Sequence, residues 1–303
     1  MNFVSYFTAT ADPYYYAALL VDFILLFAML VLVRVVFGRI AGGINTTEEL
    51  AKKDNHAFGI SLGGAIVALA VVFAGVASGD IATNLITEAM FILGYGVLGI
   101  VMMLCTRWIF DKIVFPKINL KALIANRNTA AGILDAGNMI ATSIVIFGVF
   151  SWQDGDWLTG LGLVVGMFLI TQIMLVFVSR YRVHLFARRN EGRAFRDAIE
   201  AGNAALSLRF AGFQIGAALA ISTAGNLVIF AEGANVFLSV AAWVLTAIVL
   251  FLVVIILTWL IEKVVLHGIS VESEVDLEQN FGVAAVETGA YIGIGLLLVS
   301  LLG

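Results

Sequence analysis

The segment NRNTAAGILDAGNMIAT, residues 126–142, decides the fold. Its polar and basic beginning runs directly into an apolar stretch, and Asp135 lies inside that stretch. In a helix, the ninth residue after an asparagine lies on the opposite face, whereas the seventh returns to the asparagine's face. An asparagine followed nine residues later by a glycine occurs four times, as Asn55 with Gly64, Asn128 with Gly137, Asn203 with Gly212, and Asn280 with Gly289. We therefore interpret the chain as organised around four related helices.

The composition is that of an integral membrane protein. The chain has 303 residues, of which 61% are apolar and 13% charged, and its mean hydropathy is +1.03. Soluble domains are typically about 45–50% apolar and about 25% charged. The apolar residues form runs of about 20 residues, long enough to cross a bilayer. The single cysteine, Cys105, excludes an intrachain disulfide and a thiolate metal cluster.

The order of apolar runs and connections predicts an all-α polytopic bundle. Long, charged connections alternate with short ones, so the eight spans form four helical hairpins of about 75 residues each. Pairs of hairpins form two parallel, pseudo-symmetric halves, residues 1–152 and 153–303. The expected spans are 15–38, 55–78, 83–108, 128–151, 157–180, 203–227, 235–262 and 280–302.

The basic residues indicate the orientation of the chain. Of the 17 lysines and arginines, 16 lie on or beside the long connections, and the exception is Arg209. The short connections carry acidic residues instead, such as Asp80, Asp154 and Glu232. Because cytoplasmic loops carry an excess of Lys and Arg, we expect the long connections in the cytoplasm and both termini in the periplasm.

Two acids and one arginine are expected within the membrane. Asp135 and Glu287 both follow their asparagine by seven residues, in the second and fourth hairpins. Ionisable residues in the membrane face the bundle interior or a wet cavity, because lipid exposure is costly. A pseudo-twofold axis along the membrane normal would place the two acids opposite each other. Arg209 lies at nearly the same depth and, since arginine stays protonated, it should have an anionic partner.

These charges have two interpretations. In the structural one, Arg209 pairs with Asp135 or Glu287 and holds the bundle together. In the functional one, the acid that Arg209 leaves uncompensated takes up a proton or a cation. Asn138 follows Asp135 on its face, Tyr291 lies one turn beyond Glu287, and Gln214 is on the corresponding row of the third hairpin. The candidate ion-binding or substrate-binding residues are therefore Asp135, Glu287, Arg209, Asn138, Gln214 and Tyr291.

The repeated glycines and asparagines also have two interpretations each. Small residues let helix backbones approach closely, so the glycines favour helix packing over a conduit. The asparagines favour capping of helix starts or hydrogen bonding between helices. The alternative for the asparagines is a ring of four amides at an inner pore mouth.

Two of the long connections are candidate docking surfaces. Residues 180–202 are basic, as is common near anionic lipid headgroups, and residues 263–279 are acidic, as is common in solvated segments. The alternative is that both connections dock a cytoplasmic protein. Their opposite charges also permit pairing within one chain or between two, so a homo-oligomer is one of the expected arrangements. Membrane lipid is the other expected partner.

The sequence lacks the motifs of an enzyme. His56, His184 and His267 show no ligand spacing such as HExxH. There is no Walker loop, dinucleotide-binding glycine pattern or nucleophile elbow. We therefore expect no catalytic residue, no cofactor and no metal. The basic connections lack interleaved aromatic residues, so nucleic acid is not an expected ligand.

The entry N-x-[AG] with glycine nine positions after the asparagine resembles the YjfL-like family of bacterial inner-membrane proteins (domain of unknown function 350). The resemblance covers nearly the whole chain, as a doubled form, and it implies a bacterial inner membrane. The last copy departs from the pattern, with Gly282 in place of alanine. The four entries are Asn55-His-Ala57, Asn128-Thr-Ala130, Asn203-Ala-Ala205 and Asn280-Phe-Gly282.

The leading functional prediction is a channel or transporter for a small ion, proton or solute. Asp135 and Glu287 would be its binding or protonation groups, and Arg209 would set their charge. The alternative is a non-transporting scaffold that presents its cytoplasmic connections to a partner. Water-accessible polar space around the two acids would favour transport, whereas a dry, closed pairing with Arg209 would favour the scaffold.

Overall fold

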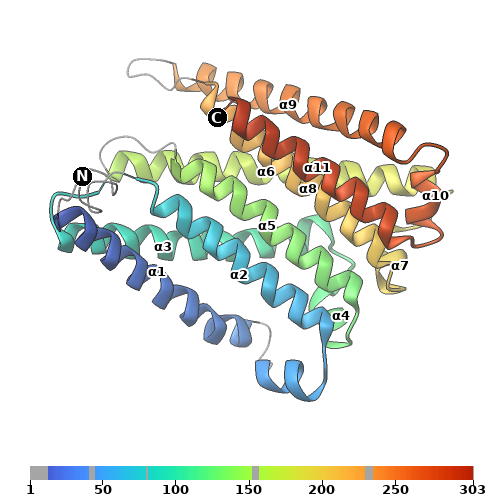
Figure 1. Cartoon of the computed structure of the whole chain (residues 1–303), viewed down its shortest axis with the longest axis horizontal. Coiled ribbons are helices and arrows are strands. Elements are labelled where there is room, and N and C mark those ends of the chain that lie inside the picture. Colours follow the sequence, from blue (N-terminus) through green and yellow to red (C-terminus); the bar gives the residue numbers. More distant parts are fainter. Residues whose placement is uncertain (1–12, 41–44, 80, 152–156, 229–234, 303) are drawn as a thin grey trace, which may run out of the picture.

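A computed structural model describes residues 13–40, 45–79, 81–151, 157–228 and 235–302 (Figure 1). The regular structure of these residues is entirely helical. Eight helices are long and apolar enough to cross a membrane, which confirms the predicted all-α, eight-span fold. They are α1 (Pro13–Ile40), α2 (His56–Val76), α3 (Leu85–Ile109), α5 (Thr129–Ser151), α6 (Trp157–Arg189), α8 (Ala204–Asn226), α9 (Val236–Val265) and α11 (Phe281–Leu302).

Four short helices lie in the long connections, and each ends just before one of the repeated asparagines. They are too short for an amphipathic period to be recognised in the sequence. Two spans are also longer than expected, because α6 continues to Arg189 and a π-helical turn, η3 (Phe110–Val114), extends α3. Figure 1 shows α4, α7 and α10 at the same end of the bundle. The short helices are η2 (Glu48–Lys52), α4 (Leu120–Ala125), α7 (Phe195–Glu200) and α10 (Val271–Asp276).

The backbone turns in the same way before every repeated asparagine. The residue preceding each asparagine has a positive φ, which reverses the chain between the short helix and the span. Three of these residues are not glycine, although the left-handed region costs an ordinary residue roughly 1–2 kcal/mol. The residues are Asp54 at 47°, Arg127 at 62°, Gly202 at 87° and Gln279 at 57°. The repeated unit is therefore a short helix, a left-handed residue, an asparagine and a span.

The four helices that follow the asparagines, α2, α5, α8 and α11, form one row, which we call the inner row (Figure 1). Each neighbouring pair packs the repeated glycine of one helix against the residue just before the glycine of the next. An added Cβ at Gly64 or Gly137 would overlap an alanine of the next helix, and one at Gly212 would lie 2.7 Å from the Cα of Thr288. The glycines thus allow close approach of helix backbones.

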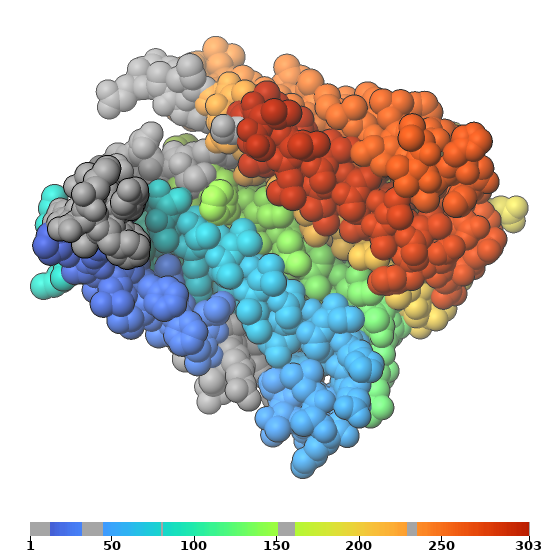
Figure 2. Space-filling view, in the orientation of Figure 1, coloured from blue at the N-terminus to red at the C-terminus, as the bar shows by residue number. Residues whose placement is uncertain are grey.

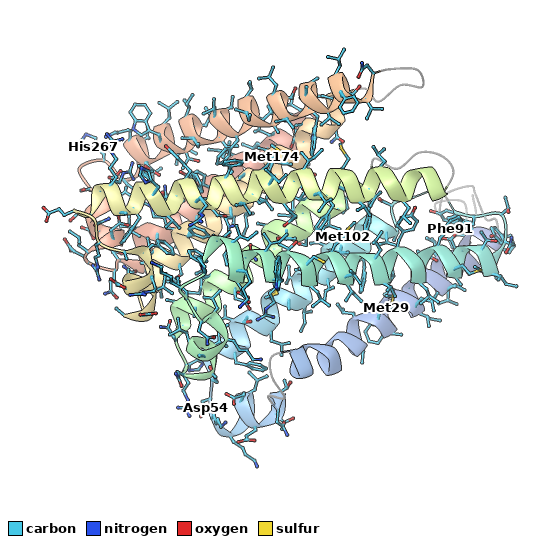
Figure 3. All side chains as sticks on the ribbon, turned by 180° about the vertical axis from the view of Figure 1, so that it is seen from behind. Met29, Asp54, Phe91, Met102, Met174 and His267 are labelled. Carbon is cyan, nitrogen blue, oxygen red and sulfur yellow. The ribbon has the colours of Figure 1, made fainter. Side chains whose placement is uncertain are left out.

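The remaining spans cover the inner row. Helix α3 contacts α2 and α5, α6 contacts α5 and α8, and α9 contacts α8 and α11. Figure 3, seen from behind, shows α3 and α6 in front of the row. The contact between α5 and α8 is among the three most extensive, and it crosses the predicted boundary at residue 152. The division into two halves stays a prediction, as does their pseudo-symmetry.

The long connections lie at one end of the bundle. Figure 3 shows the labelled Asp54 and His267 at the end opposite Phe91. The basic residues of these connections therefore gather at a single end, as a membrane orientation requires. That this end is cytoplasmic stays a prediction.

Candidate functional site

Glu287 lies in a cluster of buried charges between α6, α8 and α11. Its carboxylate is 1% exposed, and its Oε1 accepts a hydrogen bond from Arg182 Nη2 at 3.2 Å. Its Oε2 lies 2.6 Å from Arg209 Nε. Arg209 Nη1 also donates to Asp276 Oδ1 at 3.1 Å. The cluster contains two arginines and two carboxylates, so its formal charges balance.

Two members of this cluster were not among the predicted site residues. From the sequence, Asp276 belongs to a solvated acidic segment and Arg182 to a basic connection. Both are buried, because α10 folds back onto the start of α8 and α6 continues beyond its expected end. Arg182 also lies over the ring of Phe213, 4.9 Å from its centroid.

Asp135 lies in a separate cluster between α2, α3 and α5. It is 1% exposed and accepts hydrogen bonds from the hydroxyl of Ser61 and from Arg107 Nη2, the latter at 3.3 Å. Arg107 is partly exposed, and Asp111 follows it by one helical turn. This acid therefore has its own arginine as well.

The structure does not bring Asp135 and Glu287 together. They are on α5 and α11, which flank opposite sides of α8 in the inner row. Arg209 pairs with Glu287, and Arg107 pairs with Asp135. The expectation that one acid would lack a partner is not met, because Arg107 serves as an ion-pair partner as well as an orientation charge.

The sequence contains a signal for these arginines. Arg34, Arg107 and Arg182 each precede a repeated asparagine by 21 residues, and Trp259 holds that position in the last copy. A second signal lies in the packing of neighbouring copies. Each acid lies seven residues after the asparagine of its own copy. It contacts the residue that lies six positions after the asparagine of the preceding copy.

That second rule gives each neighbouring pair of inner helices a matched contact. Between α2 and α5 the two positions are Ser61 and Asp135, and between α8 and α11 they are Arg209 and Glu287. Between α5 and α8 the positions hold Leu134 and Phe210, which are both apolar and fully buried. At these positions the polar residues are therefore paired, and the apolar residues are buried.

A small uncharged chamber lies one to two turns farther along the bundle. A cavity of about 10 Å³, which has room for about one water molecule, is lined half by apolar and half by polar residues, the latter being Thr106, Asn138, Gln172, Ser179 and Gln214. Gln214 Nε2 donates to Ser179 Oγ at 2.7 Å. Within the described part of the chain, Gln172 Nε2 and Gln214 Oε1 have no hydrogen-bond partner. Such buried, unpaired amide groups are costly, so the chamber is suited to a small polar guest.

Tyr291, the sixth predicted site residue, lies on α11 one helical turn beyond Glu287, and it does not line the chamber. Its ring packs edge-to-face against Phe213, with centroids 5.5 Å apart. Its backbone carbonyl and Cβ face Gly216 across the contact between α8 and α11. The side chain therefore serves helix packing in the described structure.

The repeated asparagines connect neighbouring copies. Each one accepts a hydrogen bond from a backbone N–H at the start of its own span, at 2.8–3.2 Å. The amide groups of Asn55, Asn128 and Asn203 also donate to a carbonyl just before the next asparagine. The amide of Asn280, in the last copy, donates to Glu274 of its own copy. The asparagines thus cap helices and bond across them, rather than forming a ring.

Two acids outside the spans have lowered pKa values. A hydrogen bond from Lys53 lowers the pKa of Glu49, and a second from Asn55 adds to this effect. For Glu272, burial alone would raise the pKa, but a backbone hydrogen bond and the nearby arginines, Arg189 first, lower it overall. Arg189 Nη1 lies 3.3 Å from Glu272 Oε1, so the third and fourth long connections pair within the chain.

Acidification should weaken the start of α2 through Glu49. The folded pKa of Glu49 lies below its ordinary value of 4.5, so its stabilising effect is present above that pH and is lost as the pH falls through the folded pKa. Glu49→Gln should lower the free energy of unfolding by about 1 kcal/mol at neutral pH. At a pH below the folded pKa, Glu49 is protonated, so the substitution should no longer lower the free energy of unfolding. Thermal unfolding in detergent at several pH values measures this, with Glu278→Gln as an exposed control. A loss independent of pH would contradict the prediction.

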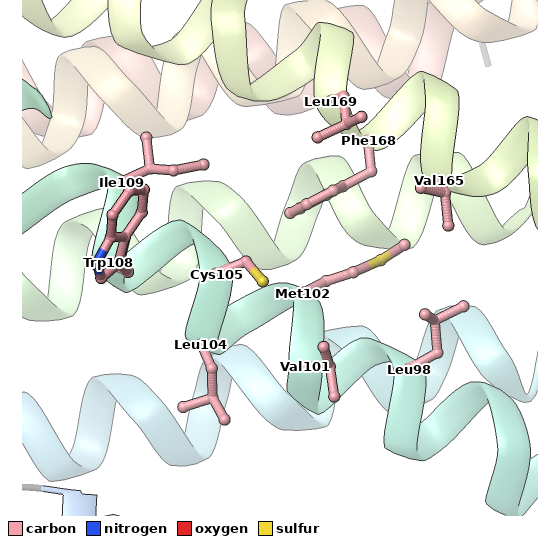
Figure 4. A pocket seen from close by; sticks show the side chains of 10 residues that line it. All are labelled: Leu98, Val101, Met102, Leu104, Cys105, Trp108, Ile109, Val165, Phe168 and Leu169. Carbon is pink, nitrogen blue, oxygen red and sulfur yellow. The ribbon is translucent and has the colours of Figure 1, made fainter.

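An apolar groove lies on the outer surface, between α3 and α6 (Figure 4). Its volume is about 530 Å³, and its lining includes Val101, Trp108, Val165 and Leu169. Cys105 also lines it, as a free and exposed thiol. The groove suits hydrocarbon, in keeping with a surface that contacts lipid.

These features define a polytopic helical membrane protein with ion pairs buried along a row of repeated inner helices. The chain belongs to the Domain of Unknown Function (DUF350) family, whose model matches residues 9–150, 80–193 and 156–302. The repeated match confirms the family resemblance and its doubled form. The middle match begins inside the first match and ends inside the third. This overlap is expected if the repeated unit is a single copy with one asparagine, rather than one half of the chain. No curated protein and no solved structure matches the chain.

Proposed function

We propose that this protein is a membrane scaffold that presents its short connecting helices to a cytoplasmic protein partner. The closed pairing of the buried charges is the observation that supports this function best. Asp135 and Glu287 are each 1% exposed, and each contacts an arginine. The cavity beside Arg182, Arg209 and Asp276 measures about 10 Å³, which is too small for a hydrated ion. Carboxylates held in this way stabilise helix contacts rather than bind a transported cation.

The presenting surface of the scaffold is the end that carries the short helices. Two acids of residues 263–279 are occupied, because Glu272 pairs with Arg189 and Asp276 pairs with Arg209. The second and third long connections keep exposed basic residues, such as Lys117 and Arg193. This charge pattern fits a partner with an acidic surface, in a bacterial inner membrane whose cytoplasmic side holds this end.

Ion flux from proteoliposomes tests the proposal. Liposomes with native protein should leak protons, potassium and sodium no faster than empty liposomes. Asp135→Asn and Glu287→Gln should leave that leak unchanged and lower the thermal midpoint of unfolding, because each removes one partner of a buried pair. Glu278→Gln, at an exposed position, is the matched control for both readouts. Ion-selective flux from the native protein that falls in the two variants would overturn the scaffold and support transport.

A second candidate function is favoured by the uncharged chamber. The unpaired amide groups of Gln172 and Gln214 could receive a small neutral solute or water that passes between α3, α5, α6 and α8. Osmotic swelling of proteoliposomes distinguishes this function from the scaffold. Faster swelling with native protein, reduced by Gln214→Leu, would support passage through the chamber, and swelling equal to that of empty liposomes would exclude it.

A further inference from the structure

The two end helices of the inner row each leave one half of the repeated contact unfilled. Along the row, the glycine nine residues after one asparagine faces the residue eight after the next asparagine. This contact forms between α2 and α5, between α5 and α8, and between α8 and α11. Helix α11 keeps its repeated glycine, Gly289, exposed. Helix α2 keeps the residue before its repeated glycine, Gly63, exposed. Figure 2 shows that α2 (light blue) and α11 (red) both reach the molecular surface.

The open face of α11 carries small residues at four positions, with the larger Val286 and Leu296 beside them. An added Cβ at Gly289 or Gly293 would meet nothing within 4 Å. Gly282 and Ala285 continue the same face toward the start of the helix, and both are exposed. By contrast, the exposed residues in the second half of α9 are bulky, for example Leu252 and Ile256. Small residues on a membrane helix are typical of close helix contact, so the exposed face of α11 suits helix packing better than that of α9.

The open face of α2 is the counterpart. Gly63 lies eight residues after Asn55, as Ala136 does after Asn128, and an added Cβ there would meet nothing within 4 Å. Val67, Ala70 and Ala74 continue this face and are exposed. The equivalent residues of α5, α8 and α11 face the preceding inner helix. Only α2 has no preceding copy in the chain.

We infer that α11 of one copy of this protein docks on α2 of a second copy, repeating the contact that joins neighbouring helices within the chain. Gly289 would face Gly63, as Gly64 faces Ala136. Asn280 would donate its remaining amide hydrogen to the second copy's Ala51 carbonyl, which lies four residues before Asn55 as Ile124 lies before Asn128. Ala51 is exposed, so its backbone can be reached.

The membrane orientation of the chain is compatible with this contact. All four inner helices begin at the end that carries the short helices, so they run in the same direction. A second copy inserted with its basic connections on the same side presents α2 in the direction that α11 requires. The docking is heterologous, because different faces meet, and it can close into a ring or continue as an array. It does not depend on the scaffold function.

Cysteine cross-linking in membranes tests the docking. Replacing Cys105 by serine removes the native thiol, and Gly289→Cys and Gly63→Cys place one thiol on each open face. Oxidation should then yield cross-linked multimers, because the Cα atoms of a disulfide lie within about 7 Å. Gly289→Cys paired with Phe177→Cys, at an exposed position of α6 near the depth of Gly289, measures random collision. Cross-linking no greater than in this control would overturn the inference, as would efficient cross-linking by Gly289→Cys alone.

A bulky residue on α11 supplies a second test. Gly289→Leu should not lower the thermal midpoint of the monomer in detergent, because its Cβ meets open space. In liposomes, the same change should raise the dissociation constant of self-association by at least about tenfold, as measured by energy transfer between labelled copies. Gly166→Leu, at an open and exposed glycine of α6, is the control and should leave association unchanged. Association of native protein that is unaffected by Gly289→Leu would also overturn the inference.

Discussion

Arg209→Met is expected to lower the free energy of unfolding by about 3–5 kcal/mol, the typical cost of removing one partner from a buried ion pair. Arg209 is 3% exposed and contacts both Glu287 and Asp276. Methionine fills much of the same space but leaves two buried carboxylates with Arg182 as the remaining cluster cation. Asp276 keeps its hydrogen bond from Asn190 at 2.9 Å. Thermal or denaturant unfolding in detergent measures the loss.

The charge balance of the cluster provides the control. Arg209→Met combined with Glu287→Gln leaves one arginine and one carboxylate, so the double variant should be more stable than Arg209→Met alone. Arg107→Met should cost less, because Arg107 is partly exposed and Asp135 keeps the hydroxyl of Ser61. A native-like unfolding midpoint for Arg209→Met would show that the cluster does not stabilise the bundle, and would remove the main support for a scaffold.

The sequence was sufficient for the membrane fold because that fold depends on composition and length. Runs such as the one containing Trp243 and Val254 satisfy the length and hydropathy of a span without knowledge of their neighbours. The repeated asparagines and glycines also follow from the sequence, because their spacing is regular. The short helices do not, since a helix of five or six residues shows less than two turns of any pattern.

The site was predicted less well because it depends on which helices are neighbours. Asp135, Glu287 and Arg209 were recognised as buried charges, and Arg209 pairs with Glu287. Pseudo-twofold symmetry suggested that the two acids meet, but the copies instead form a row, in which each acid meets the preceding copy. The partners Arg107 and Arg182 were assigned to the connections because a positive charge at a span's end satisfies orientation as well as pairing.

The row also explains why equivalent positions carry unrelated residues. A position within a row needs to match only the facing position of the next copy. Leu134 and Phe210 are both apolar and buried, whereas Arg209 and Glu287 pair by charge. Sequence similarity between copies is therefore retained at the asparagine and the glycine, where the backbone geometry is shared, and is lost at the positions between them.

Gly137→Leu is expected to lower the free energy of unfolding by at least about 3 kcal/mol, at the upper end of the cost of overpacking. A Cβ at this position would overlap the Cβ and Cα of Ala211 on α8. Because Cα belongs to the backbone, the neighbouring side chain cannot rotate away, and α5 must separate from α8. Separation weakens the most extensively buried part of the inner row, since α5 and α8 are the two most buried spans. Thermal unfolding in detergent measures the loss.

Gly289→Leu is the matched control for Gly137→Leu, because both glycines follow their asparagine by nine residues. The side chain at residue 289 would enter open space on α11, and leucine favours a helix over glycine by about 1 kcal/mol. The monomer should therefore be as stable as the native protein or slightly more so. If both substitutions were equally destabilising, close packing would not be the role of the repeated glycines. If Gly289→Leu alone weakened self-association, the same position would serve packing within the chain in three copies and contact between chains in the fourth.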